Sequence, residues 1–240
     1  MCIKSCIDFG KEALKEKDIR GKSVIEVGSC DINGSLRPIA EAFGPSYYVG
    51  VDIQIGRGVD QICKAEDLIS KFGYNKFDIL ICTELLEHVL NWKKVMHNMK
   101  HVLKPNGKLL ITTRSKGFRY HGYPYDFWRY EISDMQFIFS DFDIEIIKND
   151  PQEPGVFLMA RKPYMFCENK LNNYKIYSII QRKKSSIVVN NIYWWCRHRP
   201  LFCILNFCSQ TLPKPVGHVI KGIFPETVRK KLIRWVVPKG

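Results

Sequence analysis

The stretch Ser23-Val-Ile-Glu26-Val-Gly28-Ser-Cys-Asp31-Ile-Asn-Gly34 decides the fold of this 240-residue chain. In it, a short apolar run ends near an acid and gives way to a turn of glycine and small polar residues. An apolar stripe with helical spacing follows at once, formed by Leu36, Ile39, Ala40 and Phe43. A strand, a small-residue turn and a helix let backbone N–H groups approach a nucleotide-like ligand closely. The stretch therefore predicts a βα unit, whose turn is either a ligand site or an ordinary connection.

Strand and helix signals alternate through residues 1–162, which predicts an α/β fold with a doubly wound, mostly parallel seven-stranded sheet. The expected strands are 23–27, 47–51, 59–62, 77–82, 108–113, 142–147 and 155–160. The expected helices are 3–18, 35–43, 65–72 and 132–139, together with a long helix that carries the apolar stripe from Trp92 to Leu103 and stops at Pro105-Asn-Gly107. Because a short turn containing Pro151 and Pro154 joins the last two strands, we expect an antiparallel hairpin at the edge of the sheet.

Four segments in register resemble the class I S-adenosylmethionine-dependent methyltransferases, in the small-molecule branch that is similar to methyltransferase type 11. They are Glu26-x-Gly28, Val49-Gly-Val-Asp52, the run from Phe77-Asp78 to Glu87-His88, and Val102-Leu-Lys-Pro-Asn-Gly107. The resemblance implies S-adenosylmethionine as cofactor and a seventh strand that inserts beside the fifth. The chain departs from the family pattern in two places. The glycine-rich turn has one extra residue, and Lys64 stands where many relatives have an acid.

The resemblance also implies which residues bind the cofactor. Glu26 and Gly28 would lie under its methionine part, and Asp52 would accept hydrogen bonds from the ribose hydroxyls. The other expected contacts are Ser29, Asp31, Asn33, Gly34, Ile53, Ala65, Glu66, Asp67, Thr83 and Glu84. Without a ligand, Glu26 would be a capped strand end and Asp52 a turn acid. A nicotinamide-dependent oxidoreductase is the rival enzyme class, but the third glycine of G-x-G-x-x-G is missing.

The segment Phe118-Arg-Tyr-His121-Gly-Tyr-Pro-Tyr-Asp126-Phe-Trp-Arg129-Tyr130 follows the expected fifth strand, where doubly wound sheets place ligand-contacting loops. It resembles a stretch in methyltransferases of glycan and surface-polymer synthesis, which implies a sugar-like or other polyol acceptor. We expect catalytic roles for His121, Asp126 and His88, with Glu87-His88 opening the long helix. The expected acceptor contacts are Tyr123, Tyr125, Trp128 and Arg129. The alternatives are a packed aromatic lid with a structural Asp126–Arg129 pair, and a bracing role for His88.

Positive charge is concentrated towards the C-terminus of this chain, whose net charge is +13. Residues 1–162 carry 23 Lys and Arg against 22 Asp and Glu, whereas residues 163–240 carry 14 against 2. We therefore predict a methyltransferase domain at 1–162 and a basic, aromatic, helical extension at 163–240. Amphipathic stripes at 216–224 and 228–236 indicate that the extension lies on an anionic membrane surface. A helical cap on the domain is the alternative, and nucleic acid is the less favoured partner.

Composition and cysteine usage narrow the class of protein further. With 45% hydrophobic and 25% charged residues, the chain is expected to be globular. Nine cysteines without a C-x-x-C pair predict neither a disulfide framework nor a zinc site, and we expect no metal. A signal peptide and a spanning helix are not expected, which favours the cytoplasm, with peripheral attachment to the inner face of the membrane.

The expected function is methyl transfer from S-adenosylmethionine to an oxygen of a small molecule, a glycan or a lipid-linked saccharide. The alternative is a non-catalytic protein that kept the fold and binds membrane or RNA. The sequence leaves open the acceptor, the acceptor atom and the oligomeric state.

Overall fold

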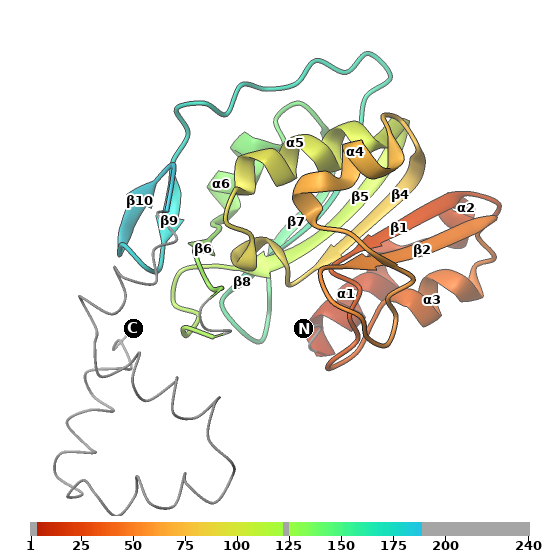
Figure 1. The fold of residues 1–240 in the computed structure, drawn as a ribbon, viewed down its shortest axis with the longest axis horizontal. Coiled ribbons are helices and arrows are strands. Elements are labelled where there is room, and N and C mark those ends of the chain that lie inside the picture. Colours follow the sequence, from red (N-terminus) through yellow and green to blue (C-terminus); the bar gives the residue numbers. More distant parts are fainter. Residues whose placement is uncertain (1–3, 122–124, 189–240) are drawn as a thin grey trace, which may run out of the picture. The chain divides into compact units, whose positions relative to one another are not determined.

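The computed structural model describes residues 4–121 and 125–188, and it confirms the α/β fold with one seven-stranded sheet (Figure 1). The strand order is β3-β2-β1-β4-β5-β8-β7. Neighbours from β3 to β5 are parallel, whereas β8 runs antiparallel to both β5 and β7. The last strand of this sheet along the chain, β8, therefore inserts beside β5, as expected. The bounds are β1 Ser23–Val27, β2 Tyr47–Asp52, β3 Gln61–Ile62, β4 Phe77–Thr83, β5 Leu103–Arg114, β7 Asp143–Asn149 and β8 Gly155–Arg161.

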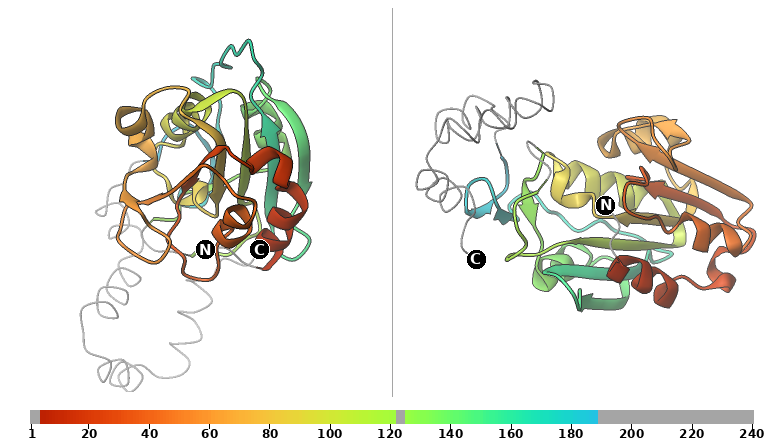
Figure 2. Two further views of the ribbon diagram at one scale, coloured as in Figure 1. Left: turned by 90° about the vertical axis from the view of Figure 1, so that its right-hand side faces the viewer. Right: turned by 90° about the horizontal axis from the view of Figure 1, so that it is seen from below.

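Helices cover both faces of this sheet, as Figures 1 and 2 show from three directions. One face carries α1 (Lys4–Ala13), α2 (Glu16–Ile19) and α3 (Arg37–Ala42). The other carries the 3₁₀ turn η1 (Ala65–Asp67), α4 (Leu68–Phe72) and α5 (Trp92–Val102). A second 3₁₀ turn, η2 (Leu86–His88), follows β4, and α6 (Ile132–Ile138) packs beside β7. Both faces are covered, which explains why the central strands are apolar along almost their whole length.

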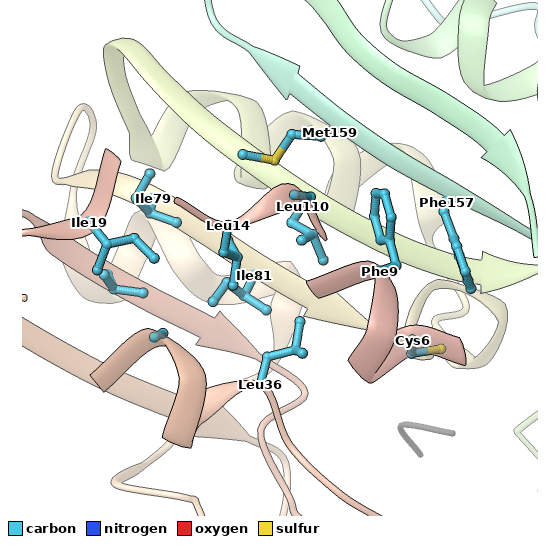
Figure 3. Close-up of a cluster of buried hydrophobic side chains, with 13 residues drawn as sticks. Cys6, Phe9, Leu14, Ile19, Leu36, Ile79, Ile81, Leu110, Phe157 and Met159 are labelled. Atoms are coloured by element: carbon cyan, nitrogen blue, oxygen red, sulfur yellow. The ribbon is translucent and has the colours of Figure 1, made fainter. Parts of the chain in front are cut away.

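A cluster of buried apolar side chains joins α1 to the sheet (Figure 3). Phe9 of α1 stacks on Phe157 of β8, with ring centroids 4.9 Å apart. Gly10 allows α1 to approach the start of α3, because a Cβ at Gly10 would lie only 2.2 Å from the Leu36 side chain. The same cluster includes Leu14, Ile19, Ile79, Ile81, Leu110 and Met159. This packing fixes α1 beside the strands whose carboxyl ends carry the candidate site.

Two of the expected helix boundaries are wrong. The leading helix is broken into α1 and α2 because Lys15 is in an extended conformation. Glu87 and His88 do not open the long helix but lie in η2, since Val89 is extended and interrupts the helical path. The long helix α5 begins instead at Trp92, where the Asn91 side chain accepts a hydrogen bond from the Lys94 N–H at 3.2 Å.

Residues 163–188 contribute strands to the compact unit. A small antiparallel sheet has the order β10-β9-β6, formed by β6 Trp128–Arg129, β9 Ile176–Ser178 and β10 Lys183–Ser185. Among the described residues, the compact unit therefore continues past residue 162 to Val188. The domain bounds expected from the sequence stay a prediction. The stripes expected at 216–224 and 228–236 lie outside the described residues. No helix within 4–121 and 125–188 is long and apolar enough to cross a bilayer.

Candidate functional site

The carboxyl ends of β1 and β2 lie side by side and bring together the central residues of the expected cofactor site. Gly28 follows β1 with a φ of 80°, a left-handed conformation that glycine adopts without a steric penalty. Its N–H donates to the Val51 carbonyl at 2.8 Å, which ties the turn to β2. Asp52 ends β2, and its Oδ2 accepts a hydrogen bond from the Cys30 N–H at 3.2 Å. The half-buried Asp52 carboxylate is thus fixed beside the turn and has further lone pairs for a ligand.

The rest of the turn packs against the loop that follows β2. The Asp31 N–H donates to the Arg57 carbonyl at 2.8 Å, and the two side chains form an ion pair at 3.3 Å. Gly34, with a φ of 127°, donates its N–H to Asp31 Oδ1 at 2.9 Å, so the extra residue is taken up in a compact turn. Asn33 is exposed. Three large apolar side chains on these two loops are also exposed, namely Ile32, Ile53 and Ile55.

Glu26 is buried at the end of β1, beneath this turn. Its carboxylate accepts hydrogen bonds from the Tyr48 hydroxyl at 2.7 Å and from the Ser35 hydroxyl at 3.2 Å. Burial raises the pKa of Glu26 to about 7, although both hydrogen bonds oppose this shift. Ser29, the next expected contact, is also buried, and its N–H donates to the Val51 carbonyl at 3.1 Å. Glu26 therefore changes charge near neutral pH inside the predicted cofactor site.

The expected adenine-side residues form η1 and are held on α5. The Ala65 carbonyl accepts a hydrogen bond from the Asn98 side chain at 3.0 Å. Glu66 is half-buried, and the exposed Asp67 forms an ion pair with Lys94 at 3.6 Å. This turn therefore has a fixed position, while its acidic side chains remain accessible to water.

Thr83 and Glu84, at the carboxyl end of β4, adjoin a buried charge cluster that the sequence did not predict. The Glu84 carboxylate accepts a hydrogen bond from the Arg114 guanidinium, which also pairs with Asp150 at 3.0 Å. Burial and the nearby Glu87 raise the pKa of Glu84 to about 9, although Arg114 opposes this shift. Arg114 thus contacts Glu84 Oε2, and the role of Glu84 towards the cofactor stays a prediction.

The turn η2 places Glu87 and His88 beside His121 from the loop after β5. Glu87 is fully buried, and its Oε2 accepts a hydrogen bond from the Thr113 hydroxyl at 2.9 Å. Its Oε1 lies 3.9 Å from His121 Nε2 and 4.0 Å from His88 Nε2. The two imidazole rings meet edge to face, with centroids 4.7 Å apart. The carboxylate and both imidazoles thus face one another at the carboxyl ends of β4 and β5.

Asp126 contacts His121 and is itself held by Arg129. Asp126 Oδ2 lies 3.1 Å from His121 Nδ1 and accepts a hydrogen bond from the His121 backbone N–H at 2.7 Å. The Arg129 guanidinium donates to both oxygens of this carboxylate, to Oδ2 at 2.8 Å. Burial opposes the charge of Asp126, but the hydrogen bonds from Arg129 and His121 outweigh it and lower the pKa of Asp126.

Hydrogen bonds to backbone carbonyls hold the loop after β5 against η2 and the residue that follows it. The Phe127 N–H donates to the Glu87 carbonyl at 2.8 Å, and the Trp128 indole N–H donates to the Val89 carbonyl at 2.9 Å. These contacts join segments that are about 40 residues apart in the sequence. They explain how His121 and Asp126 come to lie beside Glu87.

The expected acceptor contacts differ in their exposure. Trp128 and Arg129 are almost completely buried and donate hydrogen bonds to backbone carbonyls of the protein. In this structure they position the loop around an acceptor site and do not present an exposed surface to it. Tyr125 has 55% of its surface exposed and can meet a ligand directly. Tyr123 lies outside the described residues.

Residues 3–146 of this chain match the family described as methyltransferase domain. A ubiquinone biosynthesis O-methyltransferase from Coxiella burnetii is 29% identical over 118 residues, which cover 44% of this chain and 49% of that protein. The chain therefore spans about half the length of the curated ubiquinone relatives that it matches.

Two solved structures share the fold. One is a 1,6-didemethyltoxoflavin-N1-methyltransferase from Burkholderia thailandensis, solved with its acceptor and S-adenosylhomocysteine bound. Its TM-score is 0.51 at 15% identity, and the match covers 60% of this chain and 72% of that one. The other is the [4+2]-cyclase SpnF, with a TM-score of 0.51 at 15% identity over 65% of this chain and 79% of that one. At such identities the likeness shows the fold alone.

Proposed function

Because this chain belongs to the methyltransferase domain family, we propose that it transfers the methyl group of S-adenosylmethionine to an oxygen of a small-molecule acceptor. The acceptor would be a glycan, a lipid-linked saccharide or another hydroxyl-bearing metabolite. One observation carries the proposal. Asp52 and the turn at Gly28 meet at one end of the sheet, and the contact between His121 and Asp126 lies at the same end, beyond β5.

Methyl transfer from a sulfonium is an in-line displacement. The acceptor oxygen forms a bond to the methyl carbon while the carbon–sulfur bond breaks, and S-adenosylhomocysteine leaves. The protein mainly has to bind, orient and exclude water. Asp52 would accept hydrogen bonds from the ribose hydroxyls, and Glu26 would lie under the methionine part. Asp126 would hold the His121 ring so that Nε2 can act on the acceptor hydroxyl.

Oxygen is favoured as the acceptor atom because a histidine oriented by a carboxylate suits removal of a hydroxyl proton. The Coxiella burnetii relative is named an O-methyltransferase, which agrees with this choice. The Burkholderia thailandensis protein is named an N1-methyltransferase, so members of this fold also act on nitrogen. Tyr125, with its exposed ring, is the proposed contact for a sugar-like acceptor.

Cofactor binding is the first test, and isothermal titration calorimetry with S-adenosylhomocysteine can measure it without knowledge of the acceptor. We expect Asp52→Ala to weaken binding about 10- to 100-fold, because hydrogen bonds to a charged acceptor are lost. Asp143→Ala, on the exposed part of β7, is the matched control and should bind like the wild type. If the folded wild-type protein does not bind S-adenosylhomocysteine, the proposal is wrong.

We also propose that the basic C-terminal segment attaches the enzyme to an anionic membrane surface. The support comes from the sequence, in which residues 189–240 hold nine Lys and Arg against one Glu. Each basic residue near an anionic leaflet contributes roughly 1 kcal/mol, and salt screens this attraction. The full chain should co-sediment with anionic vesicles at low salt but not at high salt. Binding that persists at high salt, or is displaced by single-stranded RNA, would contradict the proposal.

A further inference from the structure

Three electron-pair donors converge beside the carboxyl end of β4. They are Glu87 Oε1, His88 Nε2 and His121 Nε2, with the oxygen 4.0 and 3.9 Å from the two nitrogens. These distances are too long for hydrogen bonds. Glu87 Oε1 is buried and has no hydrogen-bond partner among the described residues. Burying a carboxylate oxygen without a partner costs free energy. A positive charge or a hydrogen-bond donor next to Glu87 Oε1 would offset this cost.

The contacts of the other ring nitrogens differ between the two histidines. His88 Nδ1 contacts the carbonyl oxygen of Tyr125, which can only accept a hydrogen bond. His88 Nδ1 therefore carries the hydrogen, which leaves a lone pair on Nε2 of its neutral ring. His121 Nδ1 lies 3.1 Å from Asp126 Oδ2 without the geometry of a hydrogen bond, so no hydrogen bond on Nδ1 fixes which nitrogen of His121 carries the hydrogen. Both Nε2 atoms lie near Glu87 Oε1.

We propose that Glu87, His88 and His121 bind a divalent transition-metal cation, which holds the acceptor hydroxyl group. One carboxylate and two imidazoles suit zinc, iron, manganese or cobalt better than magnesium or calcium. The ligand atoms of these three side chains lie within 4.8 Å of one another. A metal about 2.1 Å from each would require only a small inward movement of the two rings. Asp126 and the Tyr125 carbonyl would be the outer partners that orient metal-bound histidines.

The role of the metal rests on the proposed methyl transfer, whereas its binding does not. A bound cation would lower the pKa of a coordinated acceptor hydroxyl. The hydroxyl proton would pass to solvent water, and the resulting oxyanion would attack the methyl carbon of S-adenosylmethionine. The carbon–sulfur bond would break with its electron pair going to sulfur. His121 would then act through the metal, as one of its ligands.

A second cluster of similar composition provides a matched control. His97 and His101 of α5 lie beside Glu168, whose Oε2 is 2.7 Å from His97 Nδ1 and 3.1 Å from His101 Nε2. Each histidine thus already has Glu168 as its hydrogen-bond partner, and all three side chains are partly exposed. Glu87 Oε1, in contrast, has no hydrogen-bond partner among the described residues. We therefore place the metal at Glu87, His88 and His121.

The test is a titration of the chelator-treated full chain with Co²⁺ alone, followed by visible absorption. We expect one site that Glu87→Gln and His88→Asn each weaken about 100-fold, in line with loss of a ligand. The double variant His97→Ala/His101→Ala should bind Co²⁺ within about threefold of the wild type. Glu87→Gln keeps an oxygen that can accept from Thr113. If that buried variant does not fold, His88→Asn, on a partly exposed side chain, decides the question.

The outcomes separate this inference from the proposed function. If the wild type does not bind Co²⁺ at millimolar concentration, the metal site is excluded. It is also excluded if only the His97→Ala/His101→Ala variant loses binding. Binding of S-adenosylhomocysteine, measured on the same samples, should be unchanged in Glu87→Gln and His88→Asn. If the protein binds the cofactor but not Co²⁺, only the proposed metal site is excluded. If it binds Co²⁺ but not the cofactor, only the proposed methyl transfer is excluded.

Discussion

The proposed cofactor half and the proposed acceptor half of the site are constructed differently. In the proposed cofactor half, backbone N–H groups of one local turn bond to β2 and to Asp52. Beside the proposed acceptor half, buried charged side chains from distant segments pair with one another, as Arg114 and Asp150 do. A backbone turn tolerates changes of side chain, whereas a buried charge needs each of its partners. Substitutions should therefore mainly reduce ligand binding in the first half and stability in the second.

Arg114→Leu should have the largest effect. It leaves the buried Asp150 carboxylate without its cation, which costs about 3–5 kcal/mol of unfolding free energy. Urea denaturation measures this loss. Arg161→Leu is the control, because Arg161 pairs with Asp143 at 3.0 Å on the exposed surface and should cost at most about 1 kcal/mol. Equal losses of unfolding free energy in the two variants would show that the buried ion pair contributes no more to stability than the exposed one.

His121→Ala should separate catalysis from cofactor binding. We expect the rate of methyl transfer to fall about 100-fold, since His121 acts on the acceptor hydroxyl directly or through a metal. The dissociation constant of S-adenosylhomocysteine should stay within about threefold, because His121 lies beyond β5. The rate is measured with tritium-labelled S-adenosylmethionine and a fractionated cell extract. A parallel loss of cofactor binding would place His121 in the other half of the site.

Glu26→Gln should change how stability depends on pH. Burial raises the pKa of Glu26 to about 7 in the folded protein, above its ordinary value of 4.5. The wild type therefore loses stability as the pH rises from about 4.5 through 7, where the buried carboxyl must ionise. At pH 8 the variant should be more stable than the wild type by roughly 2–3 kcal/mol, and near pH 5 the two should agree. Thermal melts of both proteins between pH 5 and pH 8 test this prediction. If the stability of the two proteins changes with pH in the same way, the raised pKa of Glu26 is wrong.

Asp78→Asn should have the smallest effect. Asp78 pairs with Lys104 at 2.8 Å and accepts from the Ser23 hydroxyl at 2.6 Å. Burial opposes the charge, but the hydrogen bonds from Lys104 and Ser23 prevail and lower the pKa of Asp78. This stabilisation is therefore present at neutral pH and is lost as the pH falls through that lowered pKa. The variant should lose about 0.5–1 kcal/mol at pH 7 and bind S-adenosylhomocysteine normally, since Asp78 lies near the amino end of β4, away from the proposed site.

The cofactor half could be predicted because its residues are close in the sequence. Glu26 and Gly28 belong to one motif, and Asp52 ends the next long strand. Short apolar runs identified the strands of the sheet, since β1, β4 and β8 are buried on both faces and are apolar almost throughout. The roles of the individual residues towards ligands remain predictions.

The acceptor half was less accessible from the sequence. Arg114 and Asp150 are 36 residues apart, and the sequence did not predict that they pair. The polar strand end Thr112-Thr113-Arg114 is the one signal that could have indicated a buried polar cluster. The strands β9 and β10 have three residues each, too few for an alternating pattern to be recognised. The helix opening at Glu87 was predicted wrongly because the extended Val89 follows from tertiary contacts.

Hydrogen–deuterium exchange of the full chain, with and without S-adenosylhomocysteine, tests the division of the site most directly because it needs no acceptor. We predict slower exchange at Gly28–Gly34 and at 52–55, where backbone amides adjoin the proposed cofactor. Exchange at 115–121 and 125–130 should stay unchanged. Protection confined to these two acceptor-side segments, with none at Gly28–Gly34, would contradict the account.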